Sequence, residues 1–251
     1  MTVRAALIVA LLLPAAAFAE PTAVEVELSA SREQVTGGRG DWRSAALEAV
    51  RRLGPRESLY GGVRRTERFR LHDAELFGGY AWPIGPGWNA LLEASASGSH
   101  RVLPEHSIYG QLGREIEGGW VLSAGLRHSS FTLTDVRILV LGAERYWADW
   151  RAALTIFAGR PEGASTGVSA RLALAHSYGE GSSVAVAAVA GRQVENAGPP
   201  VGVVANRVYG LSIGGRHWMS RNWALSWELS THEQGDLYRR RGLHLGLRHR
   251  F

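Results

Sequence analysis

The sequence contains no cysteine, no lysine and, beyond its first residues, no long hydrophobic run. Without cysteine the chain can form neither a disulfide framework nor a thiolate metal site. Its histidines show no metal-ligand spacing, so we expect neither a metal nor a cofactor. The basic residues are all arginines, and most stand singly on alternating segments. This distribution does not favour nucleic acid as a partner, despite a net charge of +5. A transmembrane helix needs about 20 consecutive apolar residues, and no internal segment approaches that length.

Residues 1–19 have the three parts of a secretory signal peptide. Arg4 supplies the positive charge, residues 5–13 form a short apolar run, and Ala17 and Ala19 flank an A-x-A cleavage site. We therefore expect cleavage after Ala19 and export of residues 20–251 as a single domain. An exported chain without a transmembrane helix can span a membrane only as a closed β-barrel.

The mature sequence alternates between apolar and polar residues in fourteen segments, whose lengths suit tilted membrane strands. In residues 23–32, for example, Val24 and Val26 alternate with Glu25 and Glu27. The second segment, residues 42–53, has a weaker pattern and could also form a short amphipathic helix. The sequence therefore predicts an all-β fold, a transmembrane antiparallel up-and-down barrel of about 14 strands, or of 12 if the second segment is not a strand.

Connections between these segments alternate in length. Those after even-numbered segments are short, as at 54–56 and 148–149, and those after odd-numbered segments are mostly longer, as at 98–106 and 194–205. Outer-membrane barrels have short periplasmic turns and longer outer loops. Tryptophans cluster beside the short turns, and such amphipathic rings prefer the membrane interface. The predicted periplasmic aromatic girdle comprises Trp82, Trp88, Trp120, Trp147, Trp150, Trp218 and Trp223.

The last segment, residues 238–251, has a period of two and ends on an aromatic residue. A leucine row occupies one face, and His249 and Phe251 continue it. This pattern is typical of the closing strand of an outer-membrane barrel, so we expect the barrel assembly machinery to recognise it. The predicted assembly signal is Gly246, His249 and Phe251. On the opposite face, Arg248 should meet Glu25 and Glu27 where the last strand pairs with the first.

Several short stretches occur in a characteristic order along most of the mature chain. They are Val-Leu-Pro-Glu-His at 102–106, Leu-Gly-Ala-Glu-Arg-Tyr at 141–146, His-Ser-Tyr at 176–178, Gly-Arg-His-Trp at 215–218, Gln-Gly-Asp-Leu-Tyr-Arg at 234–239 and Gly-Leu-Arg-His-Arg-Phe at 246–251. Together they resemble the YaiO family of outer-membrane β-barrel proteins, most specifically in the C-terminal third. The resemblance implies a barrel in the bacterial outer membrane, no established enzymatic activity, and an association with surface polysaccharide.

The faces opposite the apolar rows should line the lumen, and their charges fall into two groups. The early strands contribute a predicted acidic wall of Glu25, Glu27, Glu48, Glu75, Glu93 and Glu115. The later strands contribute a predicted basic wall of Arg137, Arg145, Arg151, Arg171, Arg216 and Arg248. Separated walls would orient a polar solute, since charges lining a pore tune its selectivity. Alternatively, the two signs pair and fill the lumen, because buried charges must be paired.

One candidate for catalysis stands out. His128 and Ser130 share a face, and this H-x-S spacing resembles that of lipid A deacylase barrels. A serine–histidine nucleophile needs a third group to orient the imidazole. Glu144 lies near the far end of the next strand, and Asp135 is expected to face the lumen. We therefore expect no catalytic site and no enzymatic activity.

The sequence favours a transport or structural component of the outer membrane with a charged lumen, associated with surface polysaccharide. The expected partners are outer-membrane lipids, lipopolysaccharide, the assembly machinery, and a glycan or small polar solute. The alternative function is hydrolysis of lipid A.

Overall fold

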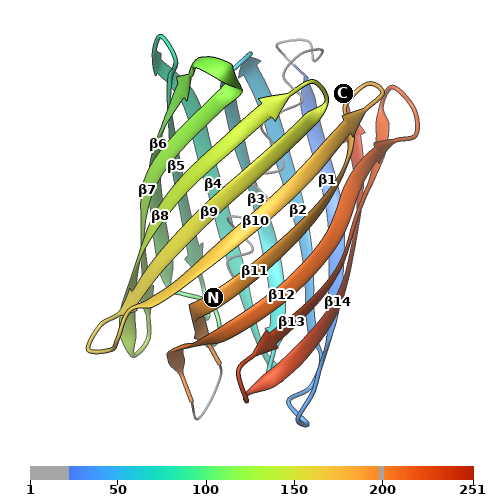
Figure 1. Ribbon diagram of the computed structural model, residues 1–251. Coiled ribbons are helices and arrows are strands. Elements are labelled where there is room, and N and C mark those ends of the chain that lie inside the picture. The colour runs from blue at the N-terminus through green and yellow to red at the C-terminus, as the bar shows by residue number, and fades with distance from the viewer. Residues whose placement is uncertain (1–22, 198–200) are drawn as a thin grey trace.

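The computed structural model describes residues 23–197 and 201–251, which form one closed β-barrel (Figure 1). The predicted signal peptide, residues 1–19, lies outside the described residues. Neighbouring strands are antiparallel and follow chain order, and β14 pairs with β1 to complete the ring. The elements are β1 (Val24–Val35), β2 (Trp42–Gly54), β3 (Glu57–Arg68), β4 (Leu71–Gly85), β5 (Trp88–Ser97), β6 (His106–Ile116), η1 (Glu117–Gly119), β7 (Trp120–Phe131), β8 (Thr134–Trp147), β9 (Trp150–Pro161), β10 (Gly167–Tyr178), β11 (Ser182–Asn196), β12 (Val203–Trp218), β13 (Trp223–Gln234) and β14 (Tyr238–Arg250). No helix among the described residues is long and apolar enough to cross a membrane.

The fourteen-strand prediction is confirmed, and the second segment is strand β2 rather than a helix. β2 pairs with β1 on one side and β3 on the other, with Glu48 opposite Glu27 and Gly62. A helix here would leave the hydrogen-bonding groups of both neighbours unpaired, which is costly in a membrane. Closure of the ring therefore requires a strand at residues 42–54, where the weak local pattern also allows a helix.

The outer face carries a broad belt of exposed aliphatic side chains. Leu28, Leu76 and Leu172 are 64%, 65% and 60% exposed, and comparable residues recur on every strand. Monomeric soluble proteins rarely show such a continuous apolar surface, whereas membrane barrels need it to contact acyl chains. The leucine row of β14 belongs to this belt, as predicted.

The two ends of the barrel differ. The short connections after even-numbered strands lie at the end that holds the start of β1 and the C-terminus, seen at the top of Figure 1. Here the amide of Phe251 donates a 2.9 Å hydrogen bond to the carbonyl of Val24. We call this the turn end, and the opposite end the loop end. The predicted loop 194–205 is shorter than expected, because β11 and β12 remain paired as far as Asn196 and Val203.

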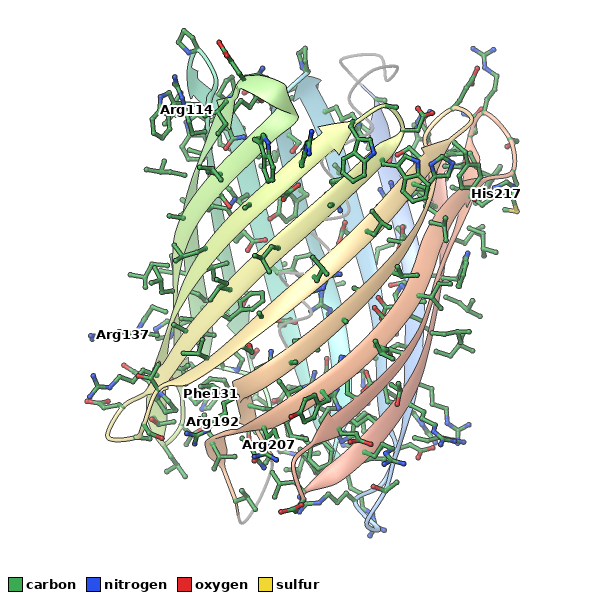
Figure 2. All side chains as sticks on the ribbon, in the orientation of Figure 1. Arg114, Phe131, Arg137, Arg192, Arg207 and His217 are labelled. Carbon is green, nitrogen blue, oxygen red and sulfur yellow. The ribbon has the colours of Figure 1, made fainter. Side chains whose placement is uncertain are left out.

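The two faces of β8 are exchanged relative to the prediction: the face predicted to contact lipid lines the lumen, and the face predicted to line the lumen is outside. Its Val136, Ile138 and Val140 are buried in the lumen, while Arg137 and Arg145 are exposed on the outer face. Figure 2 shows Arg137 directed away from the barrel wall. Both faces of this strand carry aliphatic residues, so its alternation does not say which face is inside. The choice follows from packing, because the three inward residues join a lumenal cluster with aromatic residues such as Phe157.

Candidate functional site

Two cavities formed by the described residues lie in the lumen, one toward each end. The loop-end cavity has a volume of about 180 Å³, and the turn-end cavity has about 440 Å³. Side chains of Tyr60 and Glu93 line both of them. The two cavities therefore meet at a layer of side chains in the middle of the barrel.

We call that layer the central cluster, and it comprises Tyr60, Glu93, Tyr109, Gln111 and Arg127. Glu93 on β5 accepts a hydrogen bond from the Tyr60 hydroxyl on β3 and a 2.8 Å hydrogen bond from Arg127 Nη2 on β7. The Arg127 guanidinium lies over the Tyr109 ring, 4.6 Å from its centroid, and the Tyr109 hydroxyl donates to Gln111. Hydrogen bonds, charge pairing and a cation–π contact thus link β3, β5, β6 and β7 in the layer between the two cavities.

The loop between β5 and β6, expected as an outer loop, instead folds into the mouth of the loop end. Its anchor is Asp73, which is 2% exposed and accepts hydrogen bonds from the backbone amides of Arg101, Val102 and Leu103 at 3.1, 2.7 and 2.8 Å. Asn196 on β11 donates to the Val102 carbonyl at 3.3 Å. The loop therefore reaches from β4 to the far strand β11 and covers the loop-end cavity.

A second cluster fills the mouth beside this loop. Trp42 packs edge-on against Tyr238, with ring centroids 5.5 Å apart, and Arg240 lies 4.7 Å over the Trp42 ring. Arg240 also contacts Glu33 at 2.9 Å and Glu195 at 3.7 Å. Because all three charged side chains are at most 6% exposed, this network holds β1, β11 and β14 together in a water-poor layer.

The seam between β1 and β14 carries the predicted ionic contact. Arg248 donates to Glu25 at 2.8 Å and to Glu27 at 2.6 Å, and its side chain is 3% exposed. Arg250 also binds Glu25, at 3.0 Å. Gly246 leaves room for this network, since a Cβ there would lie 2.7 Å from Glu27 Oε1. The meeting of Arg248 with Glu25 and Glu27 is confirmed.

The remaining members of the two predicted walls do not stand apart as separate surfaces. All six predicted acidic residues face inward, as do Arg151, Arg171, Arg216 and Arg248, whereas Arg137 and Arg145 face outward and do not belong to the lumen. Short-range pairs instead connect nearby strands, as in Arg64–Glu75 at 2.9 Å and Arg151–Glu144 at 3.5 Å. The charge of the lumen is therefore locally compensated rather than divided between two sides.

Prediction from the sequence missed Arg64 and Arg127, which pair with two of the predicted acids. Arg64 lies on β3 and Arg127 on β7, and neither strand contributes a residue to the predicted walls. The alternation contained the signal, because Arg64 shares a face with Thr66, and Arg127 shares one with Ser129. In both cases the polar face of the strand points into the barrel.

A separate cluster lies on the outer face near the loop end. The Ser130 hydroxyl donates to Asp135 Oδ1 at 2.8 Å, and His128 Nε2 lies 3.7 Å from Asp135 Oδ2. Asp135 therefore shares the outer face with His128 and Ser130, contrary to its predicted lumenal position. The reason is the inverted orientation of β8. Glu144 binds Tyr146 and Arg151 at the turn end, so it takes no part in this cluster.

The predicted girdle residues flank connections of the turn end. Trp88, Trp120 and Trp223 are 42%, 39% and 43% exposed. At the terminus, the His249 ring contacts Trp223 and Phe251, with centroids 4.5 and 4.4 Å apart. His249 thus extends this aromatic band, although its role with Gly246 and Phe251 in assembly stays a prediction.

Comparison with known proteins agrees with this architecture. A family model described as the YaiO membrane beta barrel domain matches residues 23–192, so the predicted C-terminal stretches from 215 onward lie outside the matched range. A comparison with curated proteins found no match.

Several solved structures share the fold. The CymD monoaromatic hydrocarbon channel has a TM-score of 0.61 and 10% identity, covering 96% of this chain and 91% of its own. A bacterial polysaccharide outer membrane secretin has a TM-score of 0.59 and 11% identity, with 93% and 100% covered. An anion-selective porin from Comamonas acidovorans has a TM-score of 0.50 and 11% identity, with 92% and 100% covered. The protein is an outer-membrane β-barrel with the architecture of porins and channels.

Proposed function

Because this chain belongs to the YaiO family of membrane β-barrel domains, we propose that it is a narrow outer-membrane transport component for small polar solutes, with glycan units as the preferred class. The observation that carries the proposal is the loop-end cavity. Carboxylates, guanidinium groups, hydroxyls and the ring of Trp42 line it, under the inward-folded loop. Such a mixture of apolar faces and a few directed polar groups is what binds polar organic solutes.

The sizes of the cavities support a small solute. The loop-end cavity, at about 180 Å³, has less than half the volume of the turn-end cavity, which suits one small polar molecule rather than a chain. The turn-end cavity, at 440 Å³, lies within the range of roughly 300–1,000 Å³ found for small-molecule sites. A solute would pass from one cavity to the other by displacing the central cluster.

The two ends of the barrel indicate how it is oriented in the outer membrane. Short turns and the tryptophan band at the turn end support a periplasmic position for that end, which directs the loop end outward. Outer-leaflet lipids, including lipopolysaccharide, would then surround the loop end.

Conductance of the refolded protein in planar bilayers tests the transport proposal. We expect small, discrete current steps, because the central cluster and the inward loop narrow the path between the two cavities. A neutral monosaccharide added on the loop-end side should reduce the current by occupying the loop-end cavity. Complete electrical silence, under conditions where a known porin conducts, would reject the proposal.

A second function, hydrolysis of an ester in an outer-leaflet glycolipid, is favoured by the cluster of His128, Ser130 and Asp135. The three side chains meet on the lipid-facing surface, with His128 and Asp135 side chains 38% and 41% exposed. Their connection differs from that of a catalytic triad, in which histidine stands between serine and the carboxylate. Here the Ser130 hydroxyl donates directly to Asp135, so it must turn to His128 before it could act as a nucleophile.

The mass of lipid A after incubation with the refolded protein tests this second function. Hydrolysis predicts the loss of one acyl chain with the native protein, and no loss with the Ser130→Ala variant. Unchanged lipid A with a protein that is folded and heat-modifiable would reject the hydrolase and leave the transport proposal unaffected.

A further inference from the structure

Four arginines on the outer face form an arc at the loop end, and the transport proposal uses none of them. They are Arg137 on β8, Arg160 on β9, Arg192 on β11 and Arg207 on β12, and all four are exposed. In Figure 2 the labelled Arg137, Arg192 and Arg207 lie toward the loop end, at the bottom of the view. We call this set the arginine arc.

The arc contains two pairs of like charges placed directly opposite each other. Arg137 is the Cα partner of Arg160, and Arg192 is the partner of Arg207. Residues opposite each other on antiparallel strands have Cβ atoms about 5 Å apart, and like charges in such positions destabilise the sheet. An anion bound between the two arginines of such a pair would offset their repulsion.

Protein groups do not supply that anion among the residues that the structure describes. Arg137, Arg160 and Arg207 form no side-chain ion pair there, and Arg192 donates only to the backbone carbonyl of Ala205, at 3.3 Å. Two acids lie close by in the fold, Asp135 on β8 and Glu162 just after β9, whose amide donates to the Asp135 carbonyl at 2.8 Å. Ser130 and His128 already engage Asp135, and neither acid forms an ion pair with the arc among the described residues. His128, the Cα partner of Arg137, can only add positive charge to this region.

The arc also lies at the edge of the apolar belt. On β8, the exposed Leu139 and Leu141 lie on the turn-end side of Arg137, which is the next outward-facing position toward the loop end. On β12, the exposed Tyr209 and Leu211 lie on the turn-end side of Arg207 in the same way. One outward step along a strand covers roughly 7 Å, so the guanidinium groups reach the headgroup layer while the leucines stay among acyl chains.

We propose that the arginine arc binds the phosphate groups of a glycolipid in the outer leaflet, with each opposed arginine pair holding one phosphate. Guanidinium groups match phosphate oxygens through paired, charge-assisted hydrogen bonds, which a single exposed arginine provides less well. A bound phosphate converts the repulsion within each pair into attraction to a shared anion. The site rests on the orientation proposed above, but it does not require that the lumen conducts.

Titration of the full-length refolded protein in detergent with fluorescent lipopolysaccharide tests the site. The same lipopolysaccharide after removal of its phosphates serves as the second probe. We expect the native protein to bind the phosphorylated form more tightly by about tenfold or more, as the loss of charge-assisted hydrogen bonds predicts. The double variant Arg137→Gln with Arg160→Gln should lose most of this preference.

The control is the double variant Arg51→Gln with Arg145→Gln, which removes two outward arginines at the turn end. It should keep the native preference. The unfolding temperature of both variants, measured without lipid, should equal that of the native protein. For the arc variant it could also rise slightly, because one repelling pair is removed.

Four results would overturn the proposal. They are equal binding of the dephosphorylated form, an equal loss in the turn-end control, equal binding of phosphatidylglycerol vesicles, and displacement by inorganic phosphate at the concentration of the lipid. The third would mean a general anionic surface, and the fourth a site for free phosphate. Conductance recorded on the same preparations tests the transport proposal separately, so a failure of the phosphate site can be distinguished from a failure of transport.

Discussion

Replacing Glu25 by alanine should lower the free energy of unfolding by about 3 kcal/mol or more, because it leaves Arg248 buried with half of its compensation. Glu25 is 2% exposed and holds both Arg248 and Arg250 across the seam that closes the barrel. Arg216 and Arg52 lie close enough to Glu25 to act on its charge, so the loss would leave a group of arginines facing one another. Urea unfolding of the refolded protein in detergent micelles measures the change.

Arg32→Ala provides the matched control on the same strand. Arg32 forms an ion pair with Asp41 at 2.7 Å, but its side chain is 61% exposed. Exposed pairs of this kind contribute roughly 0–1 kcal/mol. If the two variants lost equal stability, the seam network would not hold the barrel closed.

Replacing Tyr60 and Arg127 together by alanine should raise the single-channel conductance severalfold, because it removes the side chains that separate the two cavities. Tyr60 lines both cavities, and Arg127 fixes Glu93 between them. Freed from these partners, the Glu93 carboxylate becomes accessible to permeating ions, and the selectivity should shift toward cations. Reversal potentials in a salt gradient measure this shift.

Asp73→Ala distinguishes the two barriers along the lumen. It removes the acceptor of three backbone hydrogen bonds and so releases the inward-folded loop, but it leaves the central cluster intact. We expect only a small rise in conductance from this change. A rise equal to that of the Tyr60 and Arg127 variant would make the loop, rather than the central cluster, the limiting barrier.

Periodicity alone could predict most of the fold, because a strand that separates lipid from a polar lumen must alternate at every residue. The contact of Arg248 with Glu25 and Glu27 also followed from the sequence. Once the strand number is even and the ring closes, the last strand must lie antiparallel to the first. Their inward charges then meet without any knowledge of the loops.

Where both faces of a strand are apolar, the sequence does not determine which face contacts lipid and which lines the lumen. On β8, Val136 and Ile138 compete with Leu139 and Leu141 for the lipid side, and the alternation favours neither. The sequence prediction assigned the wrong face of β8 to the lumen, and it therefore placed Asp135, Arg137 and Arg145 there. The outer cluster of His128, Ser130 and Asp135 and the arginine arc became visible only with the correct orientation.

The sequence by itself determined a closed, strand-spanning barrel with one aromatic end and charges in its lumen, because these features depend on local alternation and on the demand that every backbone group be paired in a membrane. Only the tertiary structure decided how the lumen is divided. The central cluster joins four strands, and the inward loop is held by an aspartate from β4 and an asparagine from β11. Such contacts depend on the curvature of the closed ring and on the path of one loop, and neither is encoded in the period of any single strand.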